Sequence, residues 1–201
     1  MKASLVIQAG GKSSRMGSNK ALLKFKGQPL ILRIIQRLNL LAEEMIIISN
    51  QPDDLAFLGL PVYPDLYPGK GPLAGLFTGL FYSRQPIVAI IATDMPFPNQ
   101  ALFLRQIELL VREKMDVVIP ASEEGLEPFH AIYRRDACLA AVKKALENDQ
   151  KRMISWFPDV KVLEVPFVDV CRYDKNGRLF TNINTCEELI QAELLEDGLS
   201  G

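Results

Sequence analysis

The residues of this chain that could do chemistry begin with a glycine-rich, cationic stretch, residues 9–20, which directly follows an apolar run. Gly10 and Gly11 have no Cβ and tolerate positive φ, so the backbone can approach a ligand closely. Free N–H groups in such a loop form a concavity that binds anions. Arg15 and Lys20 add full positive charges that suit phosphate oxygens. The stretch therefore predicts a phosphate-binding loop; the alternative is a turn of small residues between a strand and a helix.

The spacing of this loop excludes two common phosphate-binding motifs. A Walker A loop needs G-x-x-x-x-G-K-[ST], but the interval from Gly11 to Gly17 is one residue too long, and Ser18 follows where Lys is required. The dinucleotide fingerprint G-x-G-x-x-G is also absent. The loop is therefore expected to bind phosphate in a different arrangement.

A second feature is Asp94, which comes just after the apolar run 87–92. A carboxylate at the end of a buried strand, facing a phosphate-binding loop, is suited to Mg²⁺, which prefers one or two carboxylates together with substrate phosphates. Asp also often caps a turn or a helix, and alone it favours that structural role. Together with the loop at residues 9–20, Asp94 predicts a magnesium site.

A third feature is the turn at residues 65–72, which is rich in Gly and Pro and leads into a helix starting near Leu73. The N–H groups at the start of that helix could face an anion, and Asp65 could accept hydrogen bonds from a base or a ribose. A tight surface loop with a solvated Asp65 fits these residues equally well.

A fourth feature is His130, the only histidine of the chain. Alternation along a strand at residues 129–134 places His130, Ile132 and Arg134 on one face. A lone histidine on a strand is more often structural than catalytic, so we assign His130 no catalytic role.

A fifth feature is the polar stretch near the C-terminus, where Asn182 and Asn184 precede Thr185 and Glu188. Thr185 and Glu188 have the S/T-x-x-E spacing of a helix capping box. Alternation puts Asn182 and Asn184 on the same side, where their amides could bind substrate or metal-bound water.

The elements that must position these residues alternate along the chain. Strands are expected at residues 3–7, 45–48, 61–63, 87–92, 117–119, 129–134, 160–165 and 167–170, and helices at 29–41, 73–82, 99–113, 137–146 and 185–195. This order predicts an α/β fold with a mostly parallel sheet covered on both faces. Ligands of such sheets bind outside the carboxyl ends of the strands, so the features above are expected to meet there.

Composition and net charge further narrow the class of protein. The 201 residues suit one domain, and a formal net charge of −1 provides no general attraction to nucleic acid or membranes. Cys138, Cys171 and Cys186 suggest neither a disulfide framework nor a zinc site. We see no signal peptide and no apolar run long enough to span a bilayer, and we expect a cytoplasmic protein.

Further motifs accompany the opening stretch in order along the chain. They are Gly27-Gln28-Pro29-Leu30, Gly71-Pro72-Leu73-Ala74-Gly75, Asp94-Met95-Pro96 and Asn182-Ile183-Asn184-Thr185-Cys186. With residues 8–20, which match L-A-G-G-x-S-x-R-M-G-x-x-K, they resemble the molybdenum cofactor guanylyltransferases, the MobA-type nucleotidyltransferases. The resemblance spans residues 3–190. Gln8 stands where the family usually has Leu, and Cys186 where it usually has Pro.

The resemblance implies a Rossmann-like three-layer nucleotidyltransferase fold. It implies a single domain over residues 1–201, with a nucleotide-binding half at about 1–120 and an acceptor-binding half at about 121–201. It also implies the reaction, in which GMP passes from GTP to the terminal phosphate of molybdenum-molybdopterin with release of pyrophosphate. The Gly-Gly pair implies GTP, since an Ala-Gly pair goes with cytosine nucleotides in relatives.

The resemblance further implies roles for individual residues. The catalytic residues are Arg15, Lys20 and Asp94; the nucleotide contacts are Ala9, Gly10, Gly11, Lys20, Asn50, Asp65 and Asp94; Asp94 holds Mg²⁺; and Asn182 and Asn184 face the acceptor. GTP and a molybdopterin-type acceptor are the expected partners, with transient contact to enzymes that insert or receive the cofactor. Neither nucleic acid nor a membrane is expected as a partner.

Some alternatives stay open from the sequence. A related enzyme could use CTP or a sugar-phosphate acceptor, since similar loops serve those substrates. A regulatory protein that binds GTP without turnover is a second alternative, against which the presence of Arg15, Lys20 and Asp94 argues. Lys12, Arg134 and Arg135 are further candidates for the acceptor side because the pterin carries phosphate, although such a residue is more often a solvated surface charge.

Overall fold

The structure is a computed structural model that describes residues 2–10 and 19–197. Its strands are β1 (Ala3–Gln8), β2 (Lys24–Phe25), β3 (Gln28–Pro29), β4 (Glu44–Ile48), β5 (Val62–Tyr63), β6 (Ile87–Ala92), β7 (Val117–Ser122), β8 (Gly125–Leu126), β9 (His130–Arg134) and β10 (Val162–Val165). Its α-helices are α1 (Leu30–Arg37), α2 (Pro72–Tyr82), α3 (Gln100–Arg112), α4 (Arg135–Glu147), α5 (Phe167–Val170) and α6 (Cys186–Asp197). Short 3₁₀ helices are η1 (Lys20–Leu22), η2 (Pro52–Leu58) and η3 (Phe157–Asp159).

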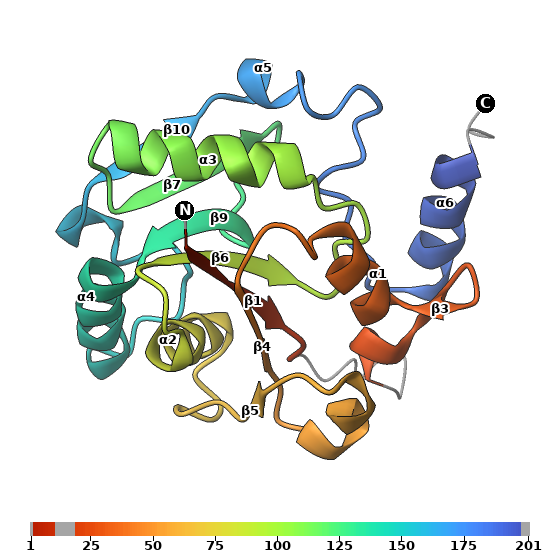
Figure 1. The fold of residues 1–201 in the computed structure, drawn as a ribbon, viewed down its shortest axis with the longest axis horizontal. Helices are drawn as coiled ribbons and strands as arrows, with labels where there is room; N and C mark the ends of the chain where they lie inside the picture. The colour runs from red at the N-terminus through yellow and green to blue at the C-terminus, as the bar shows by residue number, and fades with distance from the viewer. Residues whose placement is uncertain (1, 11–18, 198–201) are drawn as a thin grey trace.

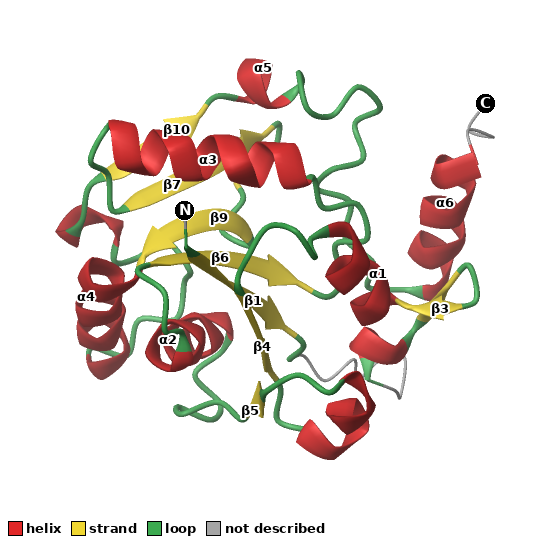
Figure 2. Ribbon diagram, in the orientation of Figure 1, coloured by secondary structure: helices red, strands yellow, loops and turns green. Residues whose placement is uncertain are grey.

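The strands form one eight-stranded sheet in the order β10-β7-β9-β6-β1-β4-β5, with β8 paired to β7, and β2 and β3 form a separate hairpin. Strand β1 pairs in parallel with β4 and β6, and β4 with β5 and β7 with β10 are also parallel. Strand β9 runs antiparallel between β6 and β7. The predicted α/β fold with a mostly parallel sheet is confirmed, and helices lie on both sides of it (Figures 1 and 2).

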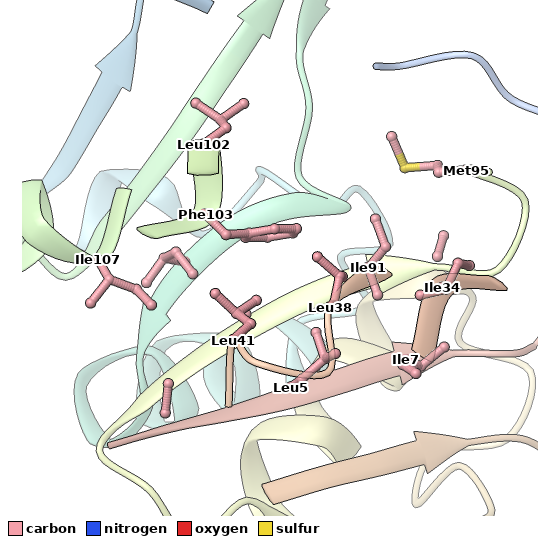
Figure 3. Packing of buried hydrophobic residues seen from close by; sticks show 14 of the residues in the cluster. Leu5, Ile7, Ile34, Leu38, Leu41, Ile91, Met95, Leu102, Phe103 and Ile107 are labelled. Atoms are coloured by element: carbon pink, nitrogen blue, oxygen red, sulfur yellow. The ribbon is translucent and has the colours of Figure 1, made fainter. Parts of the chain in front are cut away.

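The two faces of the sheet are buried under different helices because side chains alternate along each strand. Leu5 and Ile7 of β1 pack with α1 and α3, whereas Val6 packs with α2 and α4. Figure 3 shows the first of these clusters, with Ile7 beside Ile34 of α1, Leu5 beside Leu38, and Phe103 of α3 on the same side of the sheet. Both faces are apolar, as expected of a strand in the middle of a parallel sheet.

Helix α2 packs unusually close to β1 because glycine residues face the sheet. A Cβ placed on Gly79 would lie 2.6 Å from Cγ1 of Val6, and one on Gly75 would lie 2.6 Å from Oε1 of Gln8. The helix begins at Pro72. Proline suits this first position because the N–H that it lacks would have no partner within the helix. Gly71 precedes it with a φ of 74°, a conformation that favours glycine.

Two expectations about secondary structure were wrong, the first in part and the second entirely. The first helix ends at Arg37 instead of residue 41, because Leu41 N–H bonds to Leu38 O at 3.0 Å in a turn that still buries both leucines. Residues 167–170 form helix α5 and not a strand. Pro166 ends β10 at the sheet edge, and its carbonyl accepts from Val170 N–H at 3.1 Å. A short apolar run does not distinguish the two structures.

Helix α6 lies at one side of the molecule, beside α1 and the β2–β3 hairpin (Figure 1). Ala192 of α6 and Ile183, which precedes the helix, are buried in a small cluster with Phe25 and Leu30. Arg33 of α1 also forms an ion pair with Glu196. These contacts fix the C-terminal segment against the N-terminal half of the chain.

Candidate active site

The carboxyl ends of β4, β1 and β6 form one edge of the sheet, and the predicted site residues follow these ends. Gln8, the last residue of β1, is in register with Ile48 of β4 and Ala92 of β6. The arrowheads of β1 and β6 point to the same side in Figure 1. Asn50 follows β4 and Asp94 follows β6, so both lie at this edge together with the loop after β1.

A cavity of about 590 Å³ opens at this edge. Most of the site residues implied by the resemblance line it: Ala9, Gly10, Lys20, Asn50, Asp65, Asp94, Asn182 and Asn184. Gly11 and Arg15, which were also expected there, lie outside the described residues, as does Lys12. The structure thus brings residues from five separate stretches of the chain to one cavity.

Among the described residues that line the cavity, Lys20 supplies the positive charge, and it lies at the end of the cavity next to β6. It begins η1, whose N-terminus is capped by Asn19, and the Asn19 side chain accepts from Ala21 N–H at 3.1 Å. The Lys20 ammonium donates to Asn184 Oδ1 at 2.6 Å and lies 3.6 Å from Asp94 Oδ2. The cap therefore fixes the start of a short helix that aims the ammonium at an amide and a carboxylate.

The Asp94 carboxylate is largely shielded from solvent, since only 25% of its side chain is exposed. Burial raises the pKa of the Asp94 carboxyl above its ordinary value, and the nearby Lys20 ammonium acts to lower it. A partly desolvated carboxylate of this kind gains from a cation that replaces the lost water.

Asn182 and Asn184 reach the cavity because Ile183 between them is anchored away from it. Ile183 is fully buried, and its N–H donates to Asp94 O at 2.9 Å. The predicted capping box follows: Glu188 N–H donates to Thr185 Oγ1 at 3.1 Å, and Thr185 N–H donates to Glu188 Oε2 at 3.0 Å. The cap and the buried isoleucine together hold both asparagines on the cavity side, as alternation predicted.

Asn50 and Asp65 form a reciprocal pair at the β4 end of the cavity. Asn50 Nδ2 donates to Asp65 Oδ2 at 3.1 Å, and Asp65 N–H donates to Asn50 Oδ1 at 3.0 Å. Asp65 Oδ1 is buried and has no hydrogen-bond partner among the described residues. Burial raises the pKa of Asp65, and the hydrogen bond from Asn50 opposes that rise. Asp65 Oδ1, which has no partner among the described residues, is therefore available to accept a hydrogen bond from a ligand.

Other cavity-lining residues were not among the expected site residues. Gln8, Thr93 and Phe129 line the cavity, as does Gly75 of α2. A signal for Gln8 was present in the sequence, because it is a polar residue at the end of an apolar strand. Thr93 and Phe129 carry no comparable signal, since each is ordinary at a strand end.

Arg134 and Arg135 do not face the cavity, so they are wrong as candidates for the acceptor side. Arg134 pairs in register with Ile87, at the opposite end of β6. Its Nε donates to Met115 O at 3.1 Å, and Arg135 Nε donates to Leu80 O at 3.1 Å. The Arg134 guanidinium thus binds backbone carbonyls at the end of α3 and just after it, and the Arg135 guanidinium binds carbonyls near the end of α2.

His130 is a core residue. Its ring is fully buried, stacks on Phe103 at a centroid distance of 3.9 Å and meets Phe180 edge-on. Burial lowers the pKa of His130 to about 3, so the ring is neutral at ordinary pH. It does not line the cavity, in line with the absence of a catalytic assignment from the sequence.

The described residues contain neither a ready-made cluster of metal ligands nor a membrane-spanning helix. No group of three or more His, Cys, Asp or Glu side chains in residues 2–10 and 19–197 is placed to hold a metal ion. Within the same ranges, no helix combines the length and apolar character needed to cross a bilayer.

This arrangement of sheet, cavity and helices is that of the nucleotidyltransferase fold. The structure of molybdopterin-guanine dinucleotide biosynthesis protein A from Archaeoglobus fulgidus superposes with a TM-score of 0.83 at 21% identity, over 97% of this chain and 99% of that chain. The 2-C-methyl-D-erythritol 4-phosphate cytidylyltransferase from Thermus thermophilus gives a TM-score of 0.71 at 17% identity, over 98% and 100%.

Sequence comparison then gives the family. The profile of the MobA-like NTP transferase domain matches residues 5–160. A Clostridium perfringens (strain SM101) protein called "Probable molybdenum cofactor guanylyltransferase" is 39% identical over 194 residues, which cover 94% of each chain. The chain belongs to the MobA-like NTP transferase family and is a nucleotidyltransferase.

Proposed function

We propose that this enzyme transfers GMP from GTP to the terminal phosphate of molybdenum-molybdopterin, forming the guanine dinucleotide cofactor and pyrophosphate. The observation that carries the proposal is the two-ended cavity: Lys20 and Asp94 are at its charged end and the Asn50–Asp65 pair is at the other. A triphosphate suits the first end and a base suits the second. The name of the Clostridium perfringens relative supports the same activity.

At the charged end, the loop after β1 and Lys20 are proposed to hold the triphosphate. Ala9 and Gly10 line the cavity, and a Cβ on Gly10 would meet no atom of the described residues within 4 Å, which leaves open space at its Cα. Gly11 and Arg15 belong to the same proposal from the sequence. Backbone N–H groups of such a loop are suited to phosphate oxygens.

Asp94 is the residue proposed to hold Mg²⁺. Enzymes of this kind generally use a divalent metal. The donor set fits, because Mg²⁺ is commonly held by one or two carboxylates with substrate phosphates completing its shell. Asp94 supplies such a carboxylate in a partly desolvated position. The ion would supply charge neutralisation on the phosphates.

At the other end, Asp65 is proposed to read the base. Guanine presents two neighbouring donors, N1–H and the 2-amino group, and the buried Asp65 Oδ1 is an acceptor without a partner among the described residues. Asn50 holds the other carboxylate oxygen at 3.1 Å and so fixes the direction of the free one. This pair favours guanine over bases that present an acceptor there.

The chemistry needs no nucleophile from the protein. An oxygen of the acceptor's terminal phosphate forms a bond to the α-phosphorus of GTP, and the bond from that phosphorus to the oxygen bridging the β-phosphorus breaks. Pyrophosphate leaves with the electron pair. The protein contributes position and charge: Lys20 at the phosphates, and Asn182 and Asn184 toward the acceptor.

The acceptor half at about residues 121–201, transient contact with enzymes that insert or receive the cofactor, and a cytoplasmic location belong to the same proposal. Three free thiols, Cys138, Cys171 and Cys186, suit a reducing compartment. Asn182 and Asn184 in that half support its acceptor role, since they reach the cavity from the C-terminal segment.

The test is calorimetric titration of the purified chain with GTP, CTP, UTP and ATP, each with Mg²⁺, followed by pyrophosphate release on adding molybdopterin. We expect clear preference for GTP and acceptor-dependent release. Preference for CTP or UTP would assign the chain to another transferase with the same fold. GTP binding without pyrophosphate release in the presence of acceptor would indicate a protein that binds without turnover.

A further inference from the structure

The Gln8 carboxamide is a buried polar group that the proposed roles do not use. Gln8 ends β1 at the centre of the cavity edge, and only 7% of the residue is exposed. Its Nε2 is buried and has no hydrogen-bond partner among the described residues. Buried amides are normally paired, and one that lines a cavity without a partner is placed to pair with a ligand.

The direction of the Gln8 side chain follows from the strand. Val6 and Gln8 share the face of β1 that meets α2, and a Cβ on Gly75 would lie 2.6 Å from Gln8 Oε1. Gly75 leaves just enough space for the carboxamide against the first turns of α2. The amide therefore lies between β1 and the start of α2, at the wall of the cavity.

The same part of α2 also positions Asp65. Leu66 N–H donates to Thr78 Oγ1 at 3.0 Å, and Thr78 lies one turn beyond Gly75. Asp65, next to Leu66, has its own unpaired buried oxygen, Oδ1. The cavity wall beside α2 thus carries two polar groups without protein partners among the described residues: a carboxylate oxygen and a carboxamide.

We propose that Gln8 is a specificity-determining residue whose carboxamide donates a hydrogen bond to O6 of guanine while Asp65 accepts from N1–H and the 2-amino group. The inference rests on the proposed use of GTP. The amide can exchange its two ends by rotation, so Nε2 can take the cavity-facing position. Adenine offers an amino group and an unprotonated N1, and that pattern leaves the Asp65 carboxylate facing an acceptor.

The test compares GTP with 6-thioguanosine triphosphate, which keeps N1–H and the 2-amino group but has sulfur, a weaker acceptor, in place of O6. Both are measured by calorimetry with Mg²⁺ on the full chain. We expect the unmodified protein to bind GTP about five- to tenfold more tightly than the analogue, the effect of one hydrogen bond. Gln8→Met keeps the length of the side chain but cannot donate. It should weaken GTP binding by that factor and leave binding of the analogue unchanged.

Gln106→Met is the matched control, because Gln106 is also a buried glutamine but its Nε2 donates to Val118 O and His130 O, away from the cavity. It should lower stability without changing the ratio of the two affinities. Equal weakening of both nucleotides by Gln8→Met would overturn the inference, as would equal affinities in the unmodified protein, a result that does not depend on a variant folding. If CTP or ATP binds as well as GTP, the proposed function itself fails.

Discussion

Lys20 donates a 2.6 Å hydrogen bond to Asn184, although the two residues are 164 positions apart in the chain. This bond joins the start of the first half to the segment that precedes α6. It places an amide from the C-terminal segment beside the ammonium that we assign to the triphosphate. The charged end of the cavity is therefore completed only by residues from near the end of the chain.

Asn184→Ala is expected to weaken GTP binding by roughly three- to tenfold, because the Lys20 ammonium loses the acceptor that fixes its position. The free energy of unfolding should change by less than about 1 kcal/mol, since Asn184 is exposed. Calorimetry and urea unfolding check the two parts. Asn176→Ala, in an exposed turn outside the cavity, is the control and should change neither.

Asp94→Asn is expected to lower Mg²⁺-dependent pyrophosphate release by at least about a hundredfold, because it removes the carboxylate charge and keeps the shape. The fold should survive, since the buried carboxylate is costly in the free protein and its pKa is raised for that reason. Kinetics over a range of Mg²⁺ concentrations measure the effect. Turnover that keeps its Mg²⁺ dependence in this variant would refute the metal assignment.

His130 is expected to make the protein acid-sensitive between about pH 6.5 and 3. Its pKa is about 3 in the folded chain and near 6.5 when unfolded, so the unfolded state binds one more proton in this range. The contribution of His130 to the free energy of unfolding is fully present above pH 6.5. It should fall by about 2 kcal/mol between pH 6.5 and 5, and by roughly 5 kcal/mol by pH 3.

His130→Phe tests this pH dependence, because it keeps an aromatic ring against Phe103 but cannot titrate. Urea unfolding at a series of pH values should show a flatter profile between pH 6.5 and 5 than that of the unmodified chain. Since the chain has a single histidine, no other imidazole can account for the slope. An unchanged slope would show that the buried ring is not its source.

Gly79→Ala is expected to destabilise the protein by about 1–3 kcal/mol, because the new methyl group would lie 2.6 Å from Cγ1 of the fully buried Val6. Thermal or urea unfolding measures the loss. Combining it with Val6→Ala removes the methyl groups in the way, so the double variant should lose less than the two single variants added together. Strict additivity would mean that the two side chains do not collide.

Much of the fold and the site could be predicted because apolar runs and turn residues mark the strands directly. Asn50 and Asp94 follow strands that flank β1, so the rule that ligands bind at the carboxyl edge brings them together. The placement of β9 between β6 and β7 could not be read in this way, because pairing partners depend on contacts distant in sequence. The orientation of Arg134 depended on that same register.

The antiparallel insertion of β9 also has a consequence for incomplete chains. Until residues 130–134 are synthesised, the facing sides of β6 and β7 have no strand between them, and both strands are almost entirely apolar and buried in the finished protein. Unpaired apolar strand edges are templates for association with other chains. A chain that stops before residue 130 is therefore expected to aggregate, so premature termination or slow synthesis at this point would threaten solubility before it threatened activity.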